Sequence, residues 1–124
     1  MFIFANPNPR KLLVDDCVVR GISILNDQPW LKSYDQVAAK GRELYSMPST
    51  NFVWNELLMD QYFRRESIPN TCPHCYTIRD FCMDHPYGDF LVATGTHVVA
   101  IINGNYYDTW DSGDEVPIYY YERR

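Results

Sequence analysis

The sequence of 124 residues lacks any long apolar run, and no basic segment precedes the short apolar stretch at its start. A membrane-spanning helix needs about 18 or more consecutive apolar residues, and a secretory signal begins with a basic region. We therefore expect a cytoplasmic protein with no membrane partner. In a reducing cytoplasm its four cysteines should be thiols, metal ligands or a nucleophile, and not disulfides.

Basic residues are also scarce, at 11 against 16 acidic residues, which gives a formal net charge of −5. Binding to nucleic acid usually requires a basic face, and the pairs Arg64-Arg65 and Arg123-Arg124 are too short to form one. The sequence therefore predicts no nucleic-acid partner. It contains no internal repeat, low-complexity tract or linker, so we expect one domain over residues 1–124.

Helix signals come first along the chain. Residues 1–14 predict an irregular arm, because Pro7 and Pro9 resist helix formation and restrict the residues before them. Asp16 is a good N-cap, and apolar residues recur at helical spacing as far as Leu25. Cap residues and the same spacing predict further helices over residues 33–45, 50–58 and 77–85, capped by Ser33, by Thr50 or Asn51, and by Thr77.

Strand signals follow, over residues 90–93, 97–102, 105–110 and 118–122. Asn103-Gly104 joins the second and third of these strands and is the strongest short signal for a hairpin. With the helices first and an antiparallel sheet last, the sequence predicts an α+β fold.

Cys17 is the first residue that suggests chemistry. It directly follows Asp15-Asp16 and should lie in the first turn of a helix, where unpaired N–H groups and the helix dipole favour a thiolate and can bind an oxyanion. The two carboxylates partly oppose a thiolate. The alternative interpretation is a small buried apolar residue, which is common for cysteine.

The hairpin brings a histidine and an aspartate together. A two-residue turn places Val99 opposite Asp108, so that His97, Asp108 and Trp110 share one face of the sheet. Diagonal neighbours on a face can touch, and the carboxylate can then fix the imidazole tautomer while Trp110 shields the contact. The alternative is a solvated pair on the protein surface.

A thiol at a helix start, a later histidine on a strand and a carboxylate on the next strand form a nucleophile, a base and an orienting group. In this order, and with Trp110 two residues after Asp108, the chain resembles the papain-like cysteine peptidases. It is most similar to small papain-like proteins of phage and bacterial genomes. The segments that carry this likeness are Asp16-Cys17-Val18-Val19-Arg20, His97-Val98-Val99, Tyr106-Tyr107-Asp108-Thr109-Trp110-Asp111-Ser112, and Thr77-Ile78-Arg79-Asp80-Phe81 with His85-Pro86.

The resemblance covers roughly residues 12–112 and implies N-terminal helices packed on a C-terminal antiparallel sheet. It also implies a phage-type protein acting in the cytoplasm, including that of an infected bacterial host. The chain departs from the family in having no glutamine before Cys17, where papain-like enzymes have an oxyanion donor, and Lys11 stands six residues before it. Asn8, Asp15 or backbone N–H groups would have to replace that donor. The chain is also too short for a large second lobe, so an extended substrate cleft is not expected.

A second cluster, Cys72-Pro73-His74-Cys75 followed by Cys82 and His85, has a spacing that could bind zinc in a tetrahedral site. The alternative, which we favour, is that Cys82 is a core residue of a helix that simply ends at His85. We therefore expect no metal. A redox role for Cys72 and Cys75 would need a thioredoxin-like βαβ pattern, which the sequence lacks.

These observations predict a thiol hydrolase, a peptidase, isopeptidase or related amide-cleaving enzyme, that needs no cofactor and acts on a peptide or protein. Cys17 would attack the carbonyl, His97 would transfer the proton and Asp108 would orient His97, with Trp110, Asp16 and Asn8 shaping the site. The alternative is a catalytically weak or inactive papain-like domain that binds a protein, phage-encoded and directed at the host. The sequence specifies neither the substrate nor the oligomeric state.

Overall fold

The computed structural model describes residues 1–66 and 68–124, and this part of the chain has an α+β fold. Its helices are α1 (Cys17–Leu25), α2 (Trp30–Glu43), α3 (Asn51–Leu58) and α4 (Ile78–Asp84). Its strands are β1 (Phe2–Phe4), β2 (Tyr62–Arg65), β3 (Asp89–Ala93), β4 (Val98–Ile102), β5 (Asn105–Asp108) and β6 (Tyr119–Arg123).

The strands form one mixed sheet in the order β1-β5-β4-β3-β6-β2. The pairs formed by the four C-terminal strands are antiparallel, as the sequence predicts, but β1 runs parallel to β5. The predicted irregular arm over residues 1–14 is therefore wrong at its start, because Phe2–Phe4 pairs with Tyr106–Asp108. The strand β2, which pairs with β6 at the opposite edge, was not predicted either. Both strands are too short to show an alternation of apolar and polar residues. They form by pairing with strands that are distant in the sequence.

Two predicted boundaries also differ from the structure. α2 begins at Trp30, after Pro29, and Ser33 is not its cap. The Ser33 hydroxyl is fully buried and hydrogen-bonds the hydroxyl of Ser23 at 2.8 Å, which joins α1 to α2. β5 ends at Asp108, because the Asp108 carboxylate accepts the N–H of Thr109 at 2.8 Å and the chain turns there.

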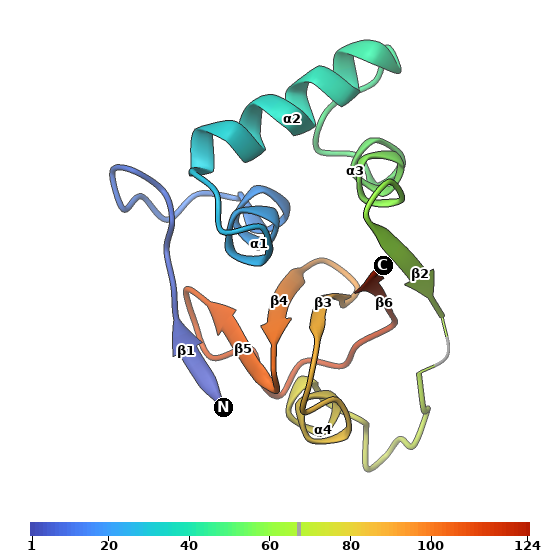
Figure 1. Ribbon diagram of the computed structural model, residues 1–124. Coiled ribbons are helices and arrows are strands. Elements are labelled where there is room, and N and C mark those ends of the chain that lie inside the picture. Colours follow the sequence, from blue (N-terminus) through green and yellow to red (C-terminus); the bar gives the residue numbers. More distant parts are fainter. Residues whose placement is uncertain (67) are drawn as a thin grey trace.

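The sheet lies between two layers of helices, with α1, α2 and α3 on one face and α4 on the other (Figure 1). Alternate residues of the central strands face the two layers, as a period of two requires. On β3, Leu91 packs with the core of the three-helix face, whereas Phe90 packs with the core around Phe81 of α4. Thr77 caps α4, as predicted, and Asp80 completes a capping box with it.

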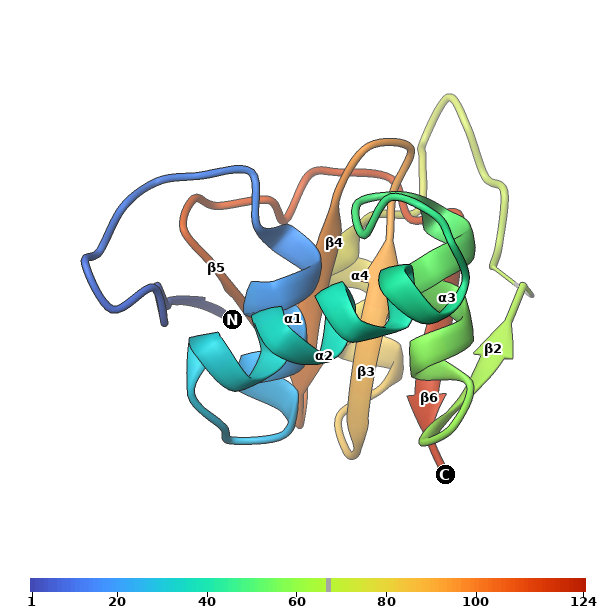
Figure 2. The same cartoon turned by 90° about the horizontal axis from the view of Figure 1, so that it is seen from above.

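The segments that carry Cys17, His97 and Asp108 lie at one edge of this layered structure. Figure 2 shows that the start of α1, the turn between β3 and β4, and the segment after β5 lie together at this edge. Among the described residues, no helix has the length and apolar character needed to cross a membrane.

Candidate active site

The β4–β5 hairpin has the predicted register, with Ile102 opposite Asn105 and Ala100 opposite Tyr107. Asn103 and Gly104 both have positive φ, at 48° and 77°, as the two-residue turn of a tight hairpin requires. The same register, continued to the end of β5, brings Asp108 beside the residues that precede β4. The local turn signal therefore places the side chains that meet at the edge of the sheet.

The contact expected between His97 and Asp108 is present. Nε2 of His97 lies 2.6 Å from Oδ2 of Asp108, although His97 precedes β4 and Asp108 ends β5. Oδ2 also accepts the hydroxyl of Ser112 at 2.7 Å, and Asp108 is fully buried. Burial alone would raise the pKa of Asp108, but the hydrogen bonds from His97 and Ser112 outweigh it and hold the pKa below its usual value.

The environment of His97 raises the pKa of its imidazole. Burial alone would lower the pKa of His97, but the hydrogen bond to Asp108 and the interaction with Cys17 raise it from 6.5 to about 9. The ring of Trp110 covers the contact with its centroid 5.3 Å from that of His97, and Trp110 itself stays half-exposed. The environment therefore favours the positively charged imidazole at neutral pH, with Asp108 at Nε2 and the other ring nitrogen left for a second partner.

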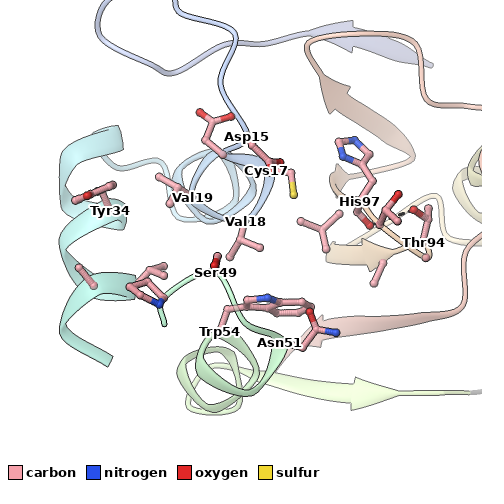
Figure 3. Close-up of a pocket in the computed structure, with 18 of the residues that line it drawn as sticks. Asp15, Cys17, Val18, Val19, Tyr34, Ser49, Asn51, Trp54, Thr94 and His97 are labelled. Atoms are coloured by element: carbon pink, nitrogen blue, oxygen red, sulfur yellow. Dashed lines mark hydrogen bonds between the residues drawn. The ribbon is translucent and has the colours of Figure 1, made fainter. Parts of the chain in front are cut away.

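Cys17 supplies that second partner from α1. It is a free cysteine, half-buried, and it is the first residue of the helix. Its sulfur lies in the cavity that the ring of His97 also lines, on the side of the ring that faces α1 (Figure 3). A helix start and a nearby histidine are the surroundings in which cysteine nucleophiles are found, so the arrangement suits nucleophilic chemistry at Cys17.

The cavity in front of the pair has a volume of about 330 Å³. Its walls come from the three helices of one face, from the β3–β4 turn and from β6. Most of the wall is apolar, and it includes Val18, Val19, Val37, Ala38, Trp54, Ala93 and Val98. The cavity can therefore hold an apolar group beside the sulfur of Cys17.

Arg20 belongs to this site, although the sequence interpretation gave it no role. Its side chain is buried, with Nη1 at 2.5 Å from Oδ1 of Asp16 and Nη2 at 3.0 Å from Oδ1 of Asp108. The i,i+4 spacing of Asp16 and Arg20 on a helix could have indicated the first contact. The second contact joins residues 88 positions apart and has no local signal.

Asp16 lies at the site but does not cap α1 with its side chain, and Asn8 lies outside the cavity. The side chain of Asp16 makes no cap hydrogen bond to α1, and it instead accepts from Arg20 and from the indole Nε1 of Trp30 at 2.8 Å. Oδ1 of Asn8 accepts the N–H of Arg10 at 2.9 Å, which fixes the loop ahead of α1. Asp16 lines the cavity, whereas Asn8 is not among its lining residues.

Of the residues before Cys17, Asp15 was predicted as a replacement for the oxyanion donor, and Lys11 stands at the position of the family's glutamine. Asp15 lines the cavity. Lys11 donates its ammonium to the carbonyl of Asn6 at 2.9 Å and does not line the cavity. The backbone N–H groups at the start of α1 remain the donors closest in sequence to the nucleophile.

The second cysteine cluster is not assembled as a metal site in the structure. Cys72 and Cys75 form a disulfide, which corrects the expectation of free thiols, because the loop turns tightly enough to bring their Cα atoms to 4.0 Å. Cys82 is buried in the core, as predicted, and burial raises its pKa to about 11. His85 stacks on Phe81 and donates from Nδ1 to the Phe81 carbonyl at 2.9 Å. Within residues 1–66 and 68–124, no three potential ligands are grouped as a metal ion would need.

Comparisons of this chain with protein-family models, with curated proteins and with solved structures found no match. The interpretation of the site therefore depends on its own geometry.

Proposed function

We propose that this protein is a papain-like thiol hydrolase that cleaves an amide bond in a peptide or protein. The observation that carries the proposal is the hydrogen bond of His97 to the buried Asp108, with Cys17 and His97 lining the same cavity. A nucleophile, a base and an orienting group at one site are the parts that acyl transfer requires.

The first half of the reaction follows from this arrangement. The thiolate of Cys17 attacks the carbonyl carbon, and the C=O electron pair moves to oxygen to form a tetrahedral oxyanion. When the oxyanion collapses, the C–N bond breaks, the imidazolium of His97 gives its proton to the departing amine, and a thioester remains on Cys17.

The second half consumes one water. His97, now neutral, takes a proton from the water as it attacks the thioester carbonyl. The carboxylic acid leaves, the C–S bond breaks, and the thiolate and imidazolium are restored. Asp108 keeps the ring oriented through both halves and stabilises its positive form.

Oxyanion stabilisation would come from backbone N–H groups at the start of α1. The helix begins at Cys17 without a side-chain cap from Asp16, and N–H groups of a first helical turn have no partner within the helix. Such groups, aimed at a developing oxyanion, stabilise the transition state more than the ground state.

A pool of fluorogenic peptide amides tests the proposal. We expect hydrolysis by the native chain, no hydrolysis by Cys17→Ala, and a loss of at least about 100-fold in His97→Gln, because general acid–base catalysis contributes that much. Cys82→Ala is the matched control, since Cys82 is the other free cysteine and lies in the core away from the cavity. Hydrolysis that survives Cys17→Ala, or its complete absence in the native chain, would contradict the proposal.

A second candidate is a papain-like domain that binds a protein without cleaving it. The observation that favours it is the engagement of Lys11 with Asn6, which leaves the position of the family's glutamine without a donor at the cavity. Under this alternative, peptides would be retained uncleaved, and Cys17→Ala would bind them as well as the native chain does in calorimetric titration.

A further inference from the structure

Charges of opposite sign alternate along one line of side chains that ends at the nucleophile. Asp16 contacts Arg20, Arg20 contacts Asp108, and Asp108 contacts His97, which faces Cys17. Arg20 is the central member, and its side chain is only 6% exposed. Burying a cation costs several kcal/mol unless it has charged partners and hydrogen bonds. The burial of Arg20 therefore depends on its two carboxylate partners.

We propose that Arg20 is a positioning residue of the site, which fixes the carboxylate of Asp108 toward the histidine and neutralises the carboxylate of Asp16 beside the nucleophile. The inference rests on the proposed thiol hydrolase function and assigns a role to a residue that does not touch the substrate.

The first part of the role is geometric. Oδ1 of Asp108 accepts from Nη2 of Arg20 at 3.0 Å and from the N–H of Thr109 at 2.8 Å. These two donors occupy one oxygen, so the other oxygen is presented to His97. A planar guanidinium holds a carboxylate at fixed angles, which an ammonium does not.

The second part of the role is electrostatic. Asp16 directly precedes Cys17, and an unpaired carboxylate there would oppose a negative charge on the sulfur. Nη1 of Arg20 lies 2.5 Å from Oδ1 of Asp16, and Trp30 donates to Oδ2 at 2.8 Å. Both oxygens of Asp16 are therefore occupied by donors, and its charge is matched by a buried cation.

The surroundings of the thiol and imidazole contain a small set of charged and titratable groups in the described part of the chain. They are Asp15 and Asp16 before α1, Arg20 on α1, Tyr34 on α2, Asp108 on β5 and Tyr119 on β6. Of these, Arg20 is the group that contacts two carboxylates at once.

Two single variants test the electrostatic part because they should act in opposite directions. The readout is the rate at which iodoacetamide labels Cys17, measured against pH. Asp16→Asn removes the anion beside the sulfur and should shift this profile to lower pH by about 0.5 to 1 unit. Arg20→Met leaves Asp16 unpaired and should shift it to higher pH by a similar amount, while the double variant should return close to the native profile.

The geometric part has its own readout, the low-field proton signal of the His97 Nε2–H that bonds Asp108. This signal should be lost to solvent exchange in Arg20→Met and retained in Asp16→Asn, which keeps the contact between Arg20 and Asp108. If Arg20→Met does not fold, Arg20→Lys replaces it. The retained positive charge should preserve the labelling profile. The loss of the planar guanidinium, which holds the Asp108 carboxylate at a fixed angle, should still weaken the Nε2–H signal.

Arg123→Met is the matched control, because Arg123 also pairs with a carboxylate, Asp89 at 2.8 Å, but lies away from the cavity. It should destabilise the protein and leave the profile and the signal unchanged. The inference is overturned if Asp16→Asn and Arg20→Met label Cys17 with the native pH profile, or if the Nε2–H signal persists without Arg20. Absence of hydrolysis by the native chain would contradict the enzyme function alone, since the Nε2–H signal is measured without any substrate.

Discussion

Oδ2 of Asp108 lies 2.6 Å from Nε2 of His97, and the aspartate is fully buried while the imidazole faces a cavity. This contact fixes the orientation of the imidazole, because it occupies Nε2 and leaves Nδ1 as the ring nitrogen available to Cys17. It also gives the imidazole its charge, and several measurable consequences depend on that charge.

The stability of the protein should depend on pH through His97. Its pKa is 6.5 in an unfolded chain and about 9 in the folded one, so the folded state binds the proton more tightly. The resulting stabilisation is fully present below pH 6.5 and is lost as the pH rises through about 9, with a limit of about 3 kcal/mol. Urea unfolding of the native chain and of His97→Gln, at several pH values, should show this loss in the native chain and not in the variant. A constant difference between the two would contradict it.

Asp108→Asn should lower the pKa of His97, because the anionic partner becomes a neutral one. It should also destabilise the fold by about 3 to 5 kcal/mol, since Arg20 loses a buried counter-ion. Titration of the His97 ring signals by NMR measures the first effect and urea unfolding the second. Ser112→Ala is the control, because it removes one neutral hydrogen bond to the same carboxylate and leaves its charge. An unchanged His97 pKa in Asp108→Asn would show that the carboxylate does not set it.

The cavity should limit the size of the group that reaches Cys17. Ala38 lines the cavity from α2, whereas its neighbour Ala39 is exposed. Ala38→Phe should slow labelling of Cys17 by a fluorescein iodoacetamide about tenfold or more, and should slow labelling by iodoacetamide itself much less. Ala39→Phe, the same change on the solvent side of the helix, should alter neither rate. Equal effects of the two variants would place the route to the sulfur elsewhere.

The parts of the fold that could be predicted from the sequence are those with a local signal. Asn103-Gly104 sets the hairpin and its register, and the Thr77–Asp80 capping box sets α4. The strands Phe2–Phe4 and Tyr62–Arg65 have no such local signal. They are short, and they are defined by their pairing with strands that are distant in the sequence.

The same difference between local signals and long-range contacts applies to the residues of the site. The contact of His97 with Asp108 follows from the hairpin register, and the position of Cys17 follows from a helix start. The contact of Arg20 with Asp108 depends on how α1 packs on the sheet, so no spacing in the sequence predicts it. Asn8 was expected at the site as a replacement for the family's upstream glutamine, and its side chain instead accepts a hydrogen bond within its own loop.

An activated thiol at Cys17 can be measured as the rate at which a limiting dose of iodoacetamide labels each free cysteine at neutral pH. Cys17 faces a protonated imidazole, whereas Cys82 is buried with its pKa raised to about 11. We predict that peptide mapping will find Cys17 labelled well before Cys82, and that His97→Ala will slow labelling of Cys17 by removing the adjacent positive charge. Labelling of Cys17 no faster than Cys82, together with a rate that His97→Ala leaves unchanged, would contradict the account, since no activated thiol would then exist.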